Sequence, residues 1–150
     1  MLAQRESCWA GSNGHTAPVS SENVELVRAI YAAWRDGAPP DRFMHEDIEY
    51  VNPPDAVETG TVRGPQSFDL IRDAYDDIEL RAERFIDAGD DVVVIATLTG
   101  TSRGARVPVG RRQGYVWTLR DGKAIRFRWF NSPEEAFQAA KIEPNPNPQL

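Results

Sequence analysis

The sequence predicts an α+β domain in which helices pack into the concave side of a curved, mainly antiparallel sheet. Two amphipathic helices enclose a first strand, a run of four strands follows, and a short helix closes the chain. Segments in which every second residue is apolar are typical of strands with one buried face. Because most of the strands follow one another without intervening helices, the pattern favours an antiparallel sheet with a helical layer over alternating βαβ units.

A first helix is predicted from Ser20, which can cap a helix, and Val19 and Val24 have the spacing of a hydrophobic staple. The glycine and two prolines of residues 36–40 end this helix. Its apolar residues recur at helical spacing and form one stripe: Val24, Val27, Ile30, Tyr31 and Trp34. The helix therefore has one face to bury.

A strand and a second helix are predicted next. A short turn capped by Asp41 leads to the strand 48–52, which two prolines end. Tyr50 and Asn52 are two residues apart, so they share one face of the sheet. After a loop rich in turn residues, Pro65 suits the first position of the second helix. The apolar stripe of this helix is Phe68, Ile71 and Tyr75.

Four strands and a last helix are predicted in the second half of the chain. A long alternating strand at 78–88 turns into a β-branched strand at 92–99, which is typical of burial on both faces. Residues 100–110 are rich in glycine and arginine and are predicted to form a mobile connection. A hairpin follows, and Ser132 begins the last helix through a capping box with proline at the first helical position.

The hairpin of residues 115–131 is the most informative segment, with Asp121 and Gly122 at its turn. The apolar face of its two arms consists of Tyr115, Trp117, Leu119, Ile125, Phe127 and Trp129. The opposite face carries arginines. A curved sheet whose inner face is aromatic predicts a cavity lined by rings, and therefore a small-molecule pocket.

Composition limits the function classes. The chain has 150 residues, 41% of them hydrophobic, and a net charge of −6, which argues against general binding to nucleic acid or anionic membranes. Cys8 alone cannot form an intrachain disulfide, and no segment is long and apolar enough to span a bilayer. We therefore expect one cytoplasmic domain at residues 20–142, with a disordered leader at 1–19 and a proline-rich disordered tail at 143–150.

Basic residues dominate between residues 103 and 128, where Asp121 is the only acidic residue. This run predicts either an anion site or an outer sheet surface that faces solvent or a second copy of the chain. We favour the surface.

Four segments, in this order, carry a resemblance to a known family: ELVRAIYAAWRDG, IEYVNPP, TVRGPQSFDLI, and VWTLRDGKAIRFRWF before SPEEAF. Together they resemble the SnoaL-like branch of the ketosteroid isomerase-like, or nuclear transport factor 2-like, superfamily. The resemblance implies a cone-shaped α+β barrel of the cystatin-like kind, with one deep pocket. It also implies a homodimer through the outer sheet face, where Arg126, Arg128 and Phe130 would lie.

The superfamily contains isomerases, cyclases, dehydratases, epoxide hydrolases and non-catalytic binders, so fold alone does not decide function. The isomerase pattern implies a carboxylate base in the first strand, where this chain has Asn52. Its oxyanion tyrosine falls near Ile30, one residue before Tyr31, and its protonated acid falls at about Tyr115. An amide cannot serve as a base near neutral pH, whereas a phenol can still donate a hydrogen bond to an oxyanion.

The epoxide hydrolase branch offers a second comparison, because Tyr50 and Asn52 resemble its water-holding Tyr-x-Asn pair. That branch also needs an Asp-Arg-Asp set. Its last-strand aspartate corresponds to Trp129 here, and Thr97 and Leu98 stand where an acid would be expected. Water could be held in such a site, but these residues would not activate it.

No metal or other cofactor is predicted. His15 falls in the leader, and His45 lies in a short polar connection that we interpret as surface. No group of histidine, cysteine and carboxylate residues has metal-ligand spacing, and no glycine-rich loop joins a strand to a helix as phosphate binding would need.

We therefore expect a SnoaL-like homodimer that binds a small apolar or aromatic molecule, with its catalytic residues left unassigned. An enzyme of this kind would be an isomerase, cyclase or hydratase that polarises a polar substituent through hydrogen bonds. The alternatives are a non-catalytic carrier or sensor, and an interaction module that uses the arginine-rich sheet face. The expected ligand-binding residues are Trp34, Tyr50, Asn52, Phe68, Tyr75, Tyr115, Trp117, Phe127 and Trp129.

Overall fold

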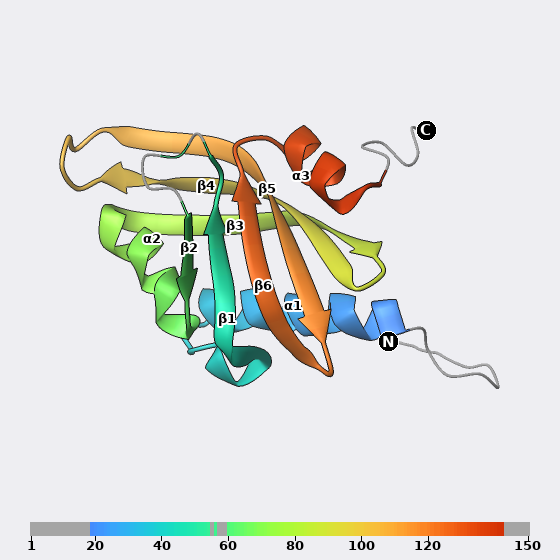
Figure 1. The fold of residues 1–150 in the computed structure, drawn as a ribbon. Helices are drawn as coiled ribbons and strands as arrows, with labels where there is room; N and C mark the ends of the chain where they lie inside the picture. Colours follow the sequence, from blue (N-terminus) through green and yellow to red (C-terminus); the bar gives the residue numbers. More distant parts are fainter. Residues whose placement is uncertain (1–18, 55, 57–59, 143–150) are drawn as a thin grey trace, which may run out of the picture.

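The computed structural model describes residues 19–54, 56 and 60–142 (Figure 1). The predicted leader and tail lie outside these residues, except for Val19, with which the first helix begins. The helices are α1 (Val19–Arg35), α2 (Asp69–Ala74) and α3 (Pro133–Ala140), with 3-10 helices at Asp41–Phe43 and Pro65–Phe68. The strands are β1 (Met44–Asn52), β2 (Gly60–Arg63), β3 (Tyr75–Ala88), β4 (Asp91–Ser102), β5 (Pro108–Arg120) and β6 (Lys123–Phe130).

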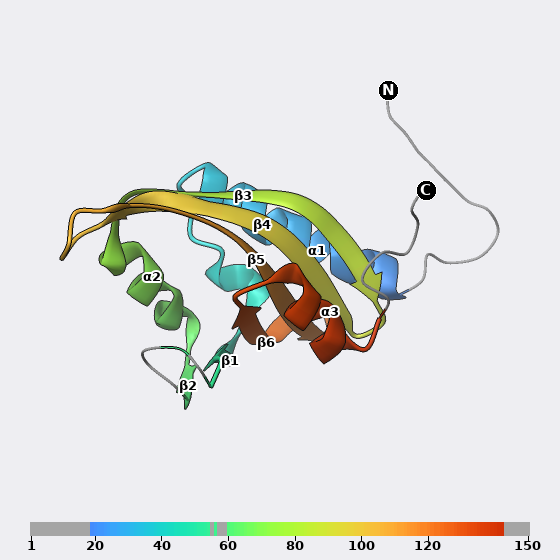
Figure 2. The same ribbon diagram turned by 90° about the horizontal axis from the view of Figure 1, so that it is seen from above.

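The strands form one curved sheet in the order β2-β1-β6-β5-β4-β3 (Figure 2). β1 and β6 run parallel, whereas the other neighbouring strands run antiparallel. The sheet is not closed, and α1 and α3 lie on opposite sides of β3, β4 and β5 (Figure 2). The predicted α+β fold with a curved, mainly antiparallel sheet is confirmed.

α1 covers what we call the inner face of the sheet. Its predicted apolar stripe is buried at Val27, Ile30 and Tyr31 and partly buried at Val24 and Trp34. This stripe packs with alternate residues of β4, such as Val92 and Val94, in one continuous core. The opposite residues of β4, such as Val93, point to the other face, so this strand is buried on both sides as its β-branched sequence predicts.

α3 covers part of the outer face. The Oγ atom of Ser132 accepts a hydrogen bond from the backbone nitrogen of Glu135, which confirms the predicted cap. Phe137 and Ala136 pack with β4 and β5 in a second apolar cluster. A Cβ atom added to Gly114 on β5 would lie 2.5 Å from the Cβ of Ala136, so only glycine allows α3 to approach this closely.

Several predicted boundaries are wrong because strand pairing extends further than local patterns indicate. Tyr75 does not end a helix but opens β3, where it pairs with Ser102. Residues 100–110 are not a mobile connection as a whole, because β4 continues to Ser102 and β5 begins at Pro108. β2, which lies in a segment predicted to be loop, pairs along β1 and makes the sheet six-stranded.

The inner face of the hairpin also differs from strict alternation. Thr118 pairs with Arg126 and Leu119 with Ala124, so Ile125 is the extra residue of a β-bulge in β6. Ala124 therefore takes the core position predicted for Ile125, and it is fully buried. The remaining predicted inner residues of the hairpin keep their places.

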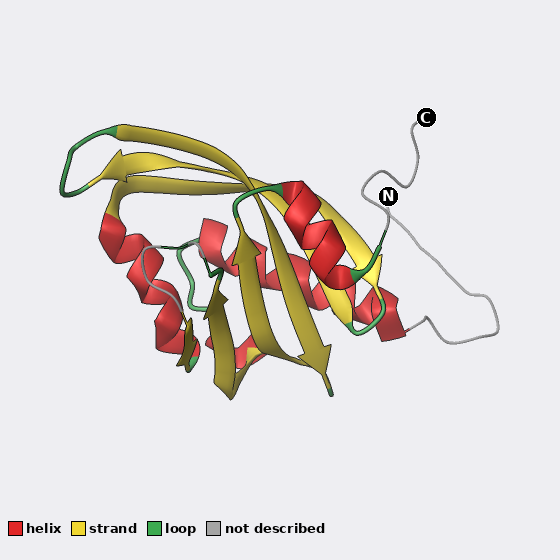
Figure 3. Ribbon diagram, turned by 45° about the horizontal axis from the view of Figure 1, so that its top comes forward, coloured by secondary structure: helices red, strands yellow, loops and turns green. Residues whose placement is uncertain are grey.

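α2 leads directly into β3 at the end of the sheet that lies far from α3 (Figures 1 and 3). Within the described residues, no helix is long and apolar enough to cross a membrane. The fold thus leaves two regions to examine for function, namely the inner face, which α1 covers, and the charged outer face beside α3.

Candidate functional site

Strand register brings most of the predicted binding residues together on the inner face. Tyr50 on β1 pairs with Phe127 on β6, and Phe127 pairs with Trp117 on β5. Two residues away on each of these strands, Tyr115 on β5 pairs with Trp129 on β6. Residues directly opposite each other in paired strands share a face. The first row is therefore three aromatic rings wide.

Rings from helices complete the cluster. Tyr31 and Trp34 come from α1, and Phe68 ends the 3-10 helix that precedes α2. Neighbouring ring centroids in this cluster lie 4.7–6.0 Å apart, within the range of favourable aromatic pairs. The structure thus places Trp34, Tyr50, Phe68, Tyr115, Trp117 and Phe127 in one buried or half-buried aromatic group.

Phe68 occupies the middle of this group. Its ring lies parallel to that of Trp117, with 4° between the planes and 5.6 Å between centroids. It also contacts the rings of Trp34, Tyr50 and Phe127. The centre of the predicted pocket is therefore filled by a side chain of the protein itself.

Polar atoms gather at one edge of the aromatic group. The hydroxyl of Tyr115 donates a hydrogen bond of 2.8 Å to the Oε1 atom of Gln113, which is buried. Gln113 precedes Tyr115 by two residues on β5, so both point to the inner face. Gln113 was not predicted, although extending the hairpin alternation by two residues would have found it.

The phenols of this edge stay protonated over the physiological range. Burial, with a smaller contribution from Tyr75, raises the pKa of Tyr50 to about 12. Burial also raises the pKa of Tyr115, and Tyr50 and Tyr75 add to this shift. A neutral phenol can donate or accept a hydrogen bond without ionising. Tyr50 and Tyr115, which we call the phenol edge, therefore stay neutral and can polarise a bound molecule.

Tyr31 has a structural partner instead. Its hydroxyl accepts a hydrogen bond of 3.0 Å from the Nε1 atom of Trp117. Burial raises the pKa of Tyr31 well above the ordinary value. This bond ties α1 to β5 and satisfies an indole nitrogen in the core.

Asn52 and Trp129 pair with each other. The Oδ1 atom of Asn52 accepts a hydrogen bond of 2.8 Å from the Nε1 atom of Trp129. The Nδ2 atom of Asn52 donates to the backbone oxygen of Gly60 on β2, at 3.4 Å. Both polar atoms of the Asn52 amide therefore have protein partners.

An open hollow of about 520 Å³ lies where α2 meets β3 and the loop after β4. Tyr75 lines it, and it also contributes to the raised pKa of Tyr50. Arg103 and Arg106 also line it, at 2.9 and 3.8 Å from the carboxylate of Asp76. The sequence predicted these arginines as part of a basic run, but the pairing with Asp76 was not predicted.

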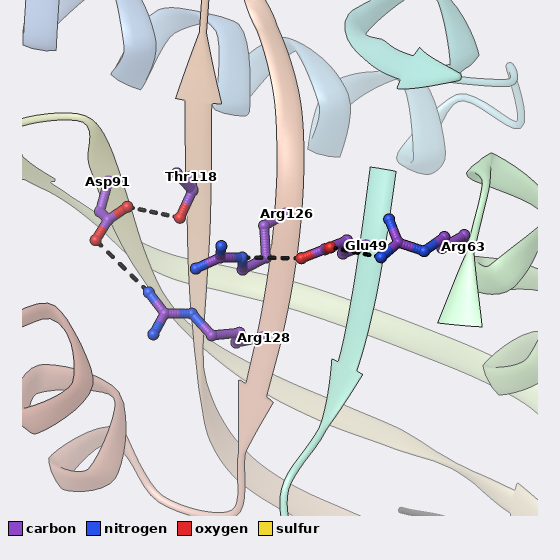
Figure 4. A network of polar contacts seen from close by, with 6 residues as sticks. All are labelled: Glu49, Arg63, Asp91, Thr118, Arg126 and Arg128. Carbon is purple, nitrogen blue, oxygen red and sulfur yellow. Dashed lines mark hydrogen bonds and ion pairs between the residues drawn. The ribbon is translucent and has the colours of Figure 1, made fainter. Parts of the chain in front are cut away.

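Ion pairs cross the outer face (Figure 4). Glu49 on β1 lies 3.2 Å from Arg126 and 3.1 Å from Arg63. Asp91 on β4 lies 3.6 Å from Arg128 and accepts a hydrogen bond from Thr118. The basic run therefore has acidic partners from strands distant in sequence, which lowers the positive charge of this surface.

Positions on this face follow the predictions in part. Arg126 and Arg128 lie on the outer face, because Arg128 pairs with Val116, which packs beneath α3. Phe130 packs against the same outer cluster. The Nε atom of Arg128 is buried without a hydrogen-bond partner, and burial lowers the pKa of its guanidinium.

His45 lies in β1 and not in the predicted connection, because this strand begins at Met44. It is exposed, as predicted, and its Nδ1 atom accepts a hydrogen bond from the backbone nitrogen of Asp47. Among the described residues, no group of three or more histidine, cysteine, aspartate or glutamate side chains could hold a metal ion.

The fold is that of the nuclear transport factor 2-like class. The family model described as the SnoaL-like domain matches residues 27–127, so the chain belongs to the SnoaL-like family. No curated protein sequence matches the chain significantly.

Three solved structures illustrate the relationship. TerC, co-crystallised with polyporic acid, is 26% identical and has a TM-score of 0.62, with coverage of 80% of this chain and 98% of TerC. A SnoaL-like polyketide cyclase from Jannaschia sp. CCS1, itself described as putative, is 23% identical over 79% of this chain and 90% of its own, with a TM-score of 0.62. A protein with a ketosteroid isomerase-like fold from Catenulispora acidiphila DSM 44928, in complex with trimethylamine, is 21% identical over 83% and 98%, with a TM-score of 0.59.

Proposed function

We propose that the inner face of this SnoaL-like domain binds a small, largely apolar molecule with a polar substituent. The observation that carries this proposal is the convergence of Tyr50, Tyr115 and Gln113 at the edge of a buried aromatic group. Such pockets are mainly apolar, with a few polar groups that orient the ligand. The proposed contact residues are Trp34, Tyr50, Asn52, Tyr75, Tyr115, Trp117, Phe127 and Trp129, with Phe68 at the centre of the site.

The chemistry of the site is polarisation by hydrogen bonds. Neutral phenols in a dry interior stabilise negative charge that develops on a carbonyl oxygen, as an isomerase, cyclase or hydratase requires. The buried polar side chains of the described residues are Asn23, Ser67 and Gln113, none of which is a carboxylate. The proposed reaction therefore uses positioning and polarisation rather than a buried carboxylate base.

A carrier or sensor is the second candidate, because the same set of buried polar residues contains no base. The ligands named for TerC and for the Catenulispora protein support small-molecule binding by this fold, whichever candidate holds. Turnover separates the two candidates.

The test is a thermal-shift screen with small ketones, lactones, epoxides and aromatic acids, followed by product analysis for each hit. Tyr115→Phe removes a hydroxyl of the phenol edge, and Tyr31→Phe removes a buried hydroxyl that bonds to Trp117 instead. We expect hits to stabilise the wild type and the Tyr31 variant by similar shifts, and the Tyr115 variant by less. Stabilisation that is equal in all three proteins would contradict a role for the phenol edge.

Two expectations from the sequence belong to this proposal, namely a cytoplasmic location and a homodimer through the outer sheet face. Light scattering coupled to size exclusion measures the oligomeric state directly. The interaction module is favoured less, because Glu49 and Asp91 pair with arginines of that face. Binding of an acidic partner there would weaken strongly with added salt, whereas pocket binding would hardly change.

A further inference from the structure

We infer that the ring of Phe68 occupies the place of a ligand's flat aromatic ring, and that the segment from Gly64 to Ala74 withdraws it to admit that ligand. This inference rests on the proposed function and adds to it a ligand class and a way into the site.

The surroundings of Phe68 form a slot for one flat ring. Trp117 lies parallel to the ring, and Tyr50 meets it edge-on, with 81° between the planes and 5.1 Å between centroids. Phe127 and Trp34 meet it at 5.0 and 5.5 Å. These four side chains come from α1, β1, β5 and β6, so the walls of the slot belong to the main helix and the sheet. A planar aromatic molecule would make the same contacts.

Phe68 itself comes from a less regular segment. It ends a four-residue 3-10 helix that begins after Gly64, whose φ of 99° favours glycine. Neither this helix nor the six-residue α2 has a side-chain hydrogen bond at its N-cap. Short helices without caps depend on tertiary contacts for their stability. Ser67 and Phe68 are the buried residues of the 3-10 helix, so the ring of Phe68 attaches it to the inner face.

Ser67 disfavours the position that the segment occupies in the structure, which we call the closed position. This residue is buried, and its Oγ atom has no hydrogen-bond partner. A buried hydroxyl without a partner is unfavourable, and it recovers hydrogen bonds when it reaches water. Withdrawal of the segment would therefore satisfy Ser67 while it vacates the slot.

The hollow of about 520 Å³ lies at the C-terminal end of the segment that carries Phe68. Arg72 on α2 and Tyr75, the first residue after α2, line this hollow. Tyr75 also contributes to the raised pKa of both Tyr50 and Tyr115. The hollow is therefore the entrance that we assign to a ligand when the segment withdraws.

The main test compares wild type, Phe68→Ala and Phe137→Ala with 2-naphthol, a flat aromatic molecule with one hydroxyl, by stopped-flow quenching of tryptophan fluorescence. Phe137 is a matched control, because its exposure of 4% resembles the 6% of Phe68 but it lies in the outer cluster. A site that is open only part of the time binds more weakly by that fraction. For an open population on the order of 10% or less, we expect Phe68→Ala to bind about tenfold or more tightly and faster. Phe137→Ala should bind like wild type.

Two results would overturn the inference in distinguishable ways. If wild type and Phe68→Ala bind 2-naphthol with equal rates and affinities, Phe68 does not block the slot, and the proposed function stands without it. If neither protein binds 2-naphthol or any compound of the thermal-shift screen, the aromatic binding site and the inference both fall.

A second measurement needs no destabilised variant. Hydrogen exchange of the wild-type amides of residues 66–74 should accelerate when 2-naphthol binds, because the segment leaves its closed position. Ser67→Ala should raise the melting temperature and weaken 2-naphthol binding, since it removes the cost of the closed position. Binding with unchanged exchange over this segment, or with unchanged affinity in Ser67→Ala, would contradict the withdrawal.

Discussion

The amide oxygen of Asn52 on β1 accepts a hydrogen bond from the indole nitrogen of Trp129 on β6, across 77 residues of sequence. β1 and β6 are the parallel pair of the sheet, and the Asn52 amide also reaches Gly60 on β2. The position where the isomerase pattern implies a base therefore joins three strands in this protein.

We expect Asn52→Ala to lower the free energy of unfolding by about 1–2 kcal/mol, because the indole nitrogen of Trp129 loses its acceptor. Urea denaturation of this variant, of Trp129→Phe and of the double variant measures the coupling. The double variant should be less destabilised than the sum of the single variants, since each single variant already breaks the bond. Fully additive effects would show that the bond contributes nothing to stability.

The raised pKa of Tyr50 predicts a loss of stability at alkaline pH. Between the unfolded value of about 10 and the folded value of about 12, the unfolded chain is deprotonated while the native Tyr50 stays protonated. The contribution of Tyr50 to the free energy of unfolding is therefore fully present below pH 10. It is lost as the pH rises to 12, by roughly 3 kcal/mol.

Urea midpoints at pH 9, 10 and 11 for wild type and Tyr50→Phe test this prediction. The variant should lose less stability over this range than the wild type, because the other titrating residues are the same in both proteins. An equal fall of the urea midpoint with pH in both proteins would contradict the raised pKa of Tyr50.

Gly114→Ala should destabilise the protein by about 1–3 kcal/mol, because the new methyl group collides with Ala136 on α3. Gly110→Ala on the same strand is the control, since its added Cβ meets only ordinary contacts. Melting temperatures report both effects, and Ala136→Gly should partly rescue the Gly114 variant. A Gly114 variant as stable as the control would mean that α3 does not pack as closely as the structure shows.

Of the two acidic residues that pair with arginines on the outer face, Asp91 should contribute more to stability than Glu49. Asp91→Ala leaves Arg128 without its carboxylate, and only 23% of the Arg128 side chain is exposed, so we expect a loss of about 1–3 kcal/mol. Glu49→Ala affects the more exposed Arg63 and Arg126, and should cost less than about 1 kcal/mol. Chemical denaturation at low and moderate salt measures both. The reverse order of effects would contradict this assignment.

Several features follow from sequence patterns that act over a few residues. The apolar stripe of α1 is confirmed because helical spacing alone decides which side chains share a face. The Ser132 cap is confirmed because its hydrogen bond spans only three residues. The aromatic inner face of the hairpin follows from strand alternation on either side of the turn at Asp121 and Gly122.

Other features depend on contacts between distant parts of the chain. Tyr75 belongs to β3 rather than to a helix because it pairs with Ser102. Ala124 replaces Ile125 in the core because a bulge absorbs one residue of β6. Both features depend on how a strand pairs with its neighbour. The propensity of a single segment does not contain that information.

The candidate site divides in the same way. Its residue types and their shared face were determined by the sequence, since Tyr50, Tyr115 and the hairpin rings follow the period of two. Only the tertiary structure decided that Phe68 fills the centre and that Gln113 accepts a hydrogen bond from the Tyr115 hydroxyl. The same holds for the pairing of Glu49 and Asp91 with arginines of the outer face. The physical reason is that periodicity sets the direction of a side chain within its own element, whereas its partner is set by how the elements pack.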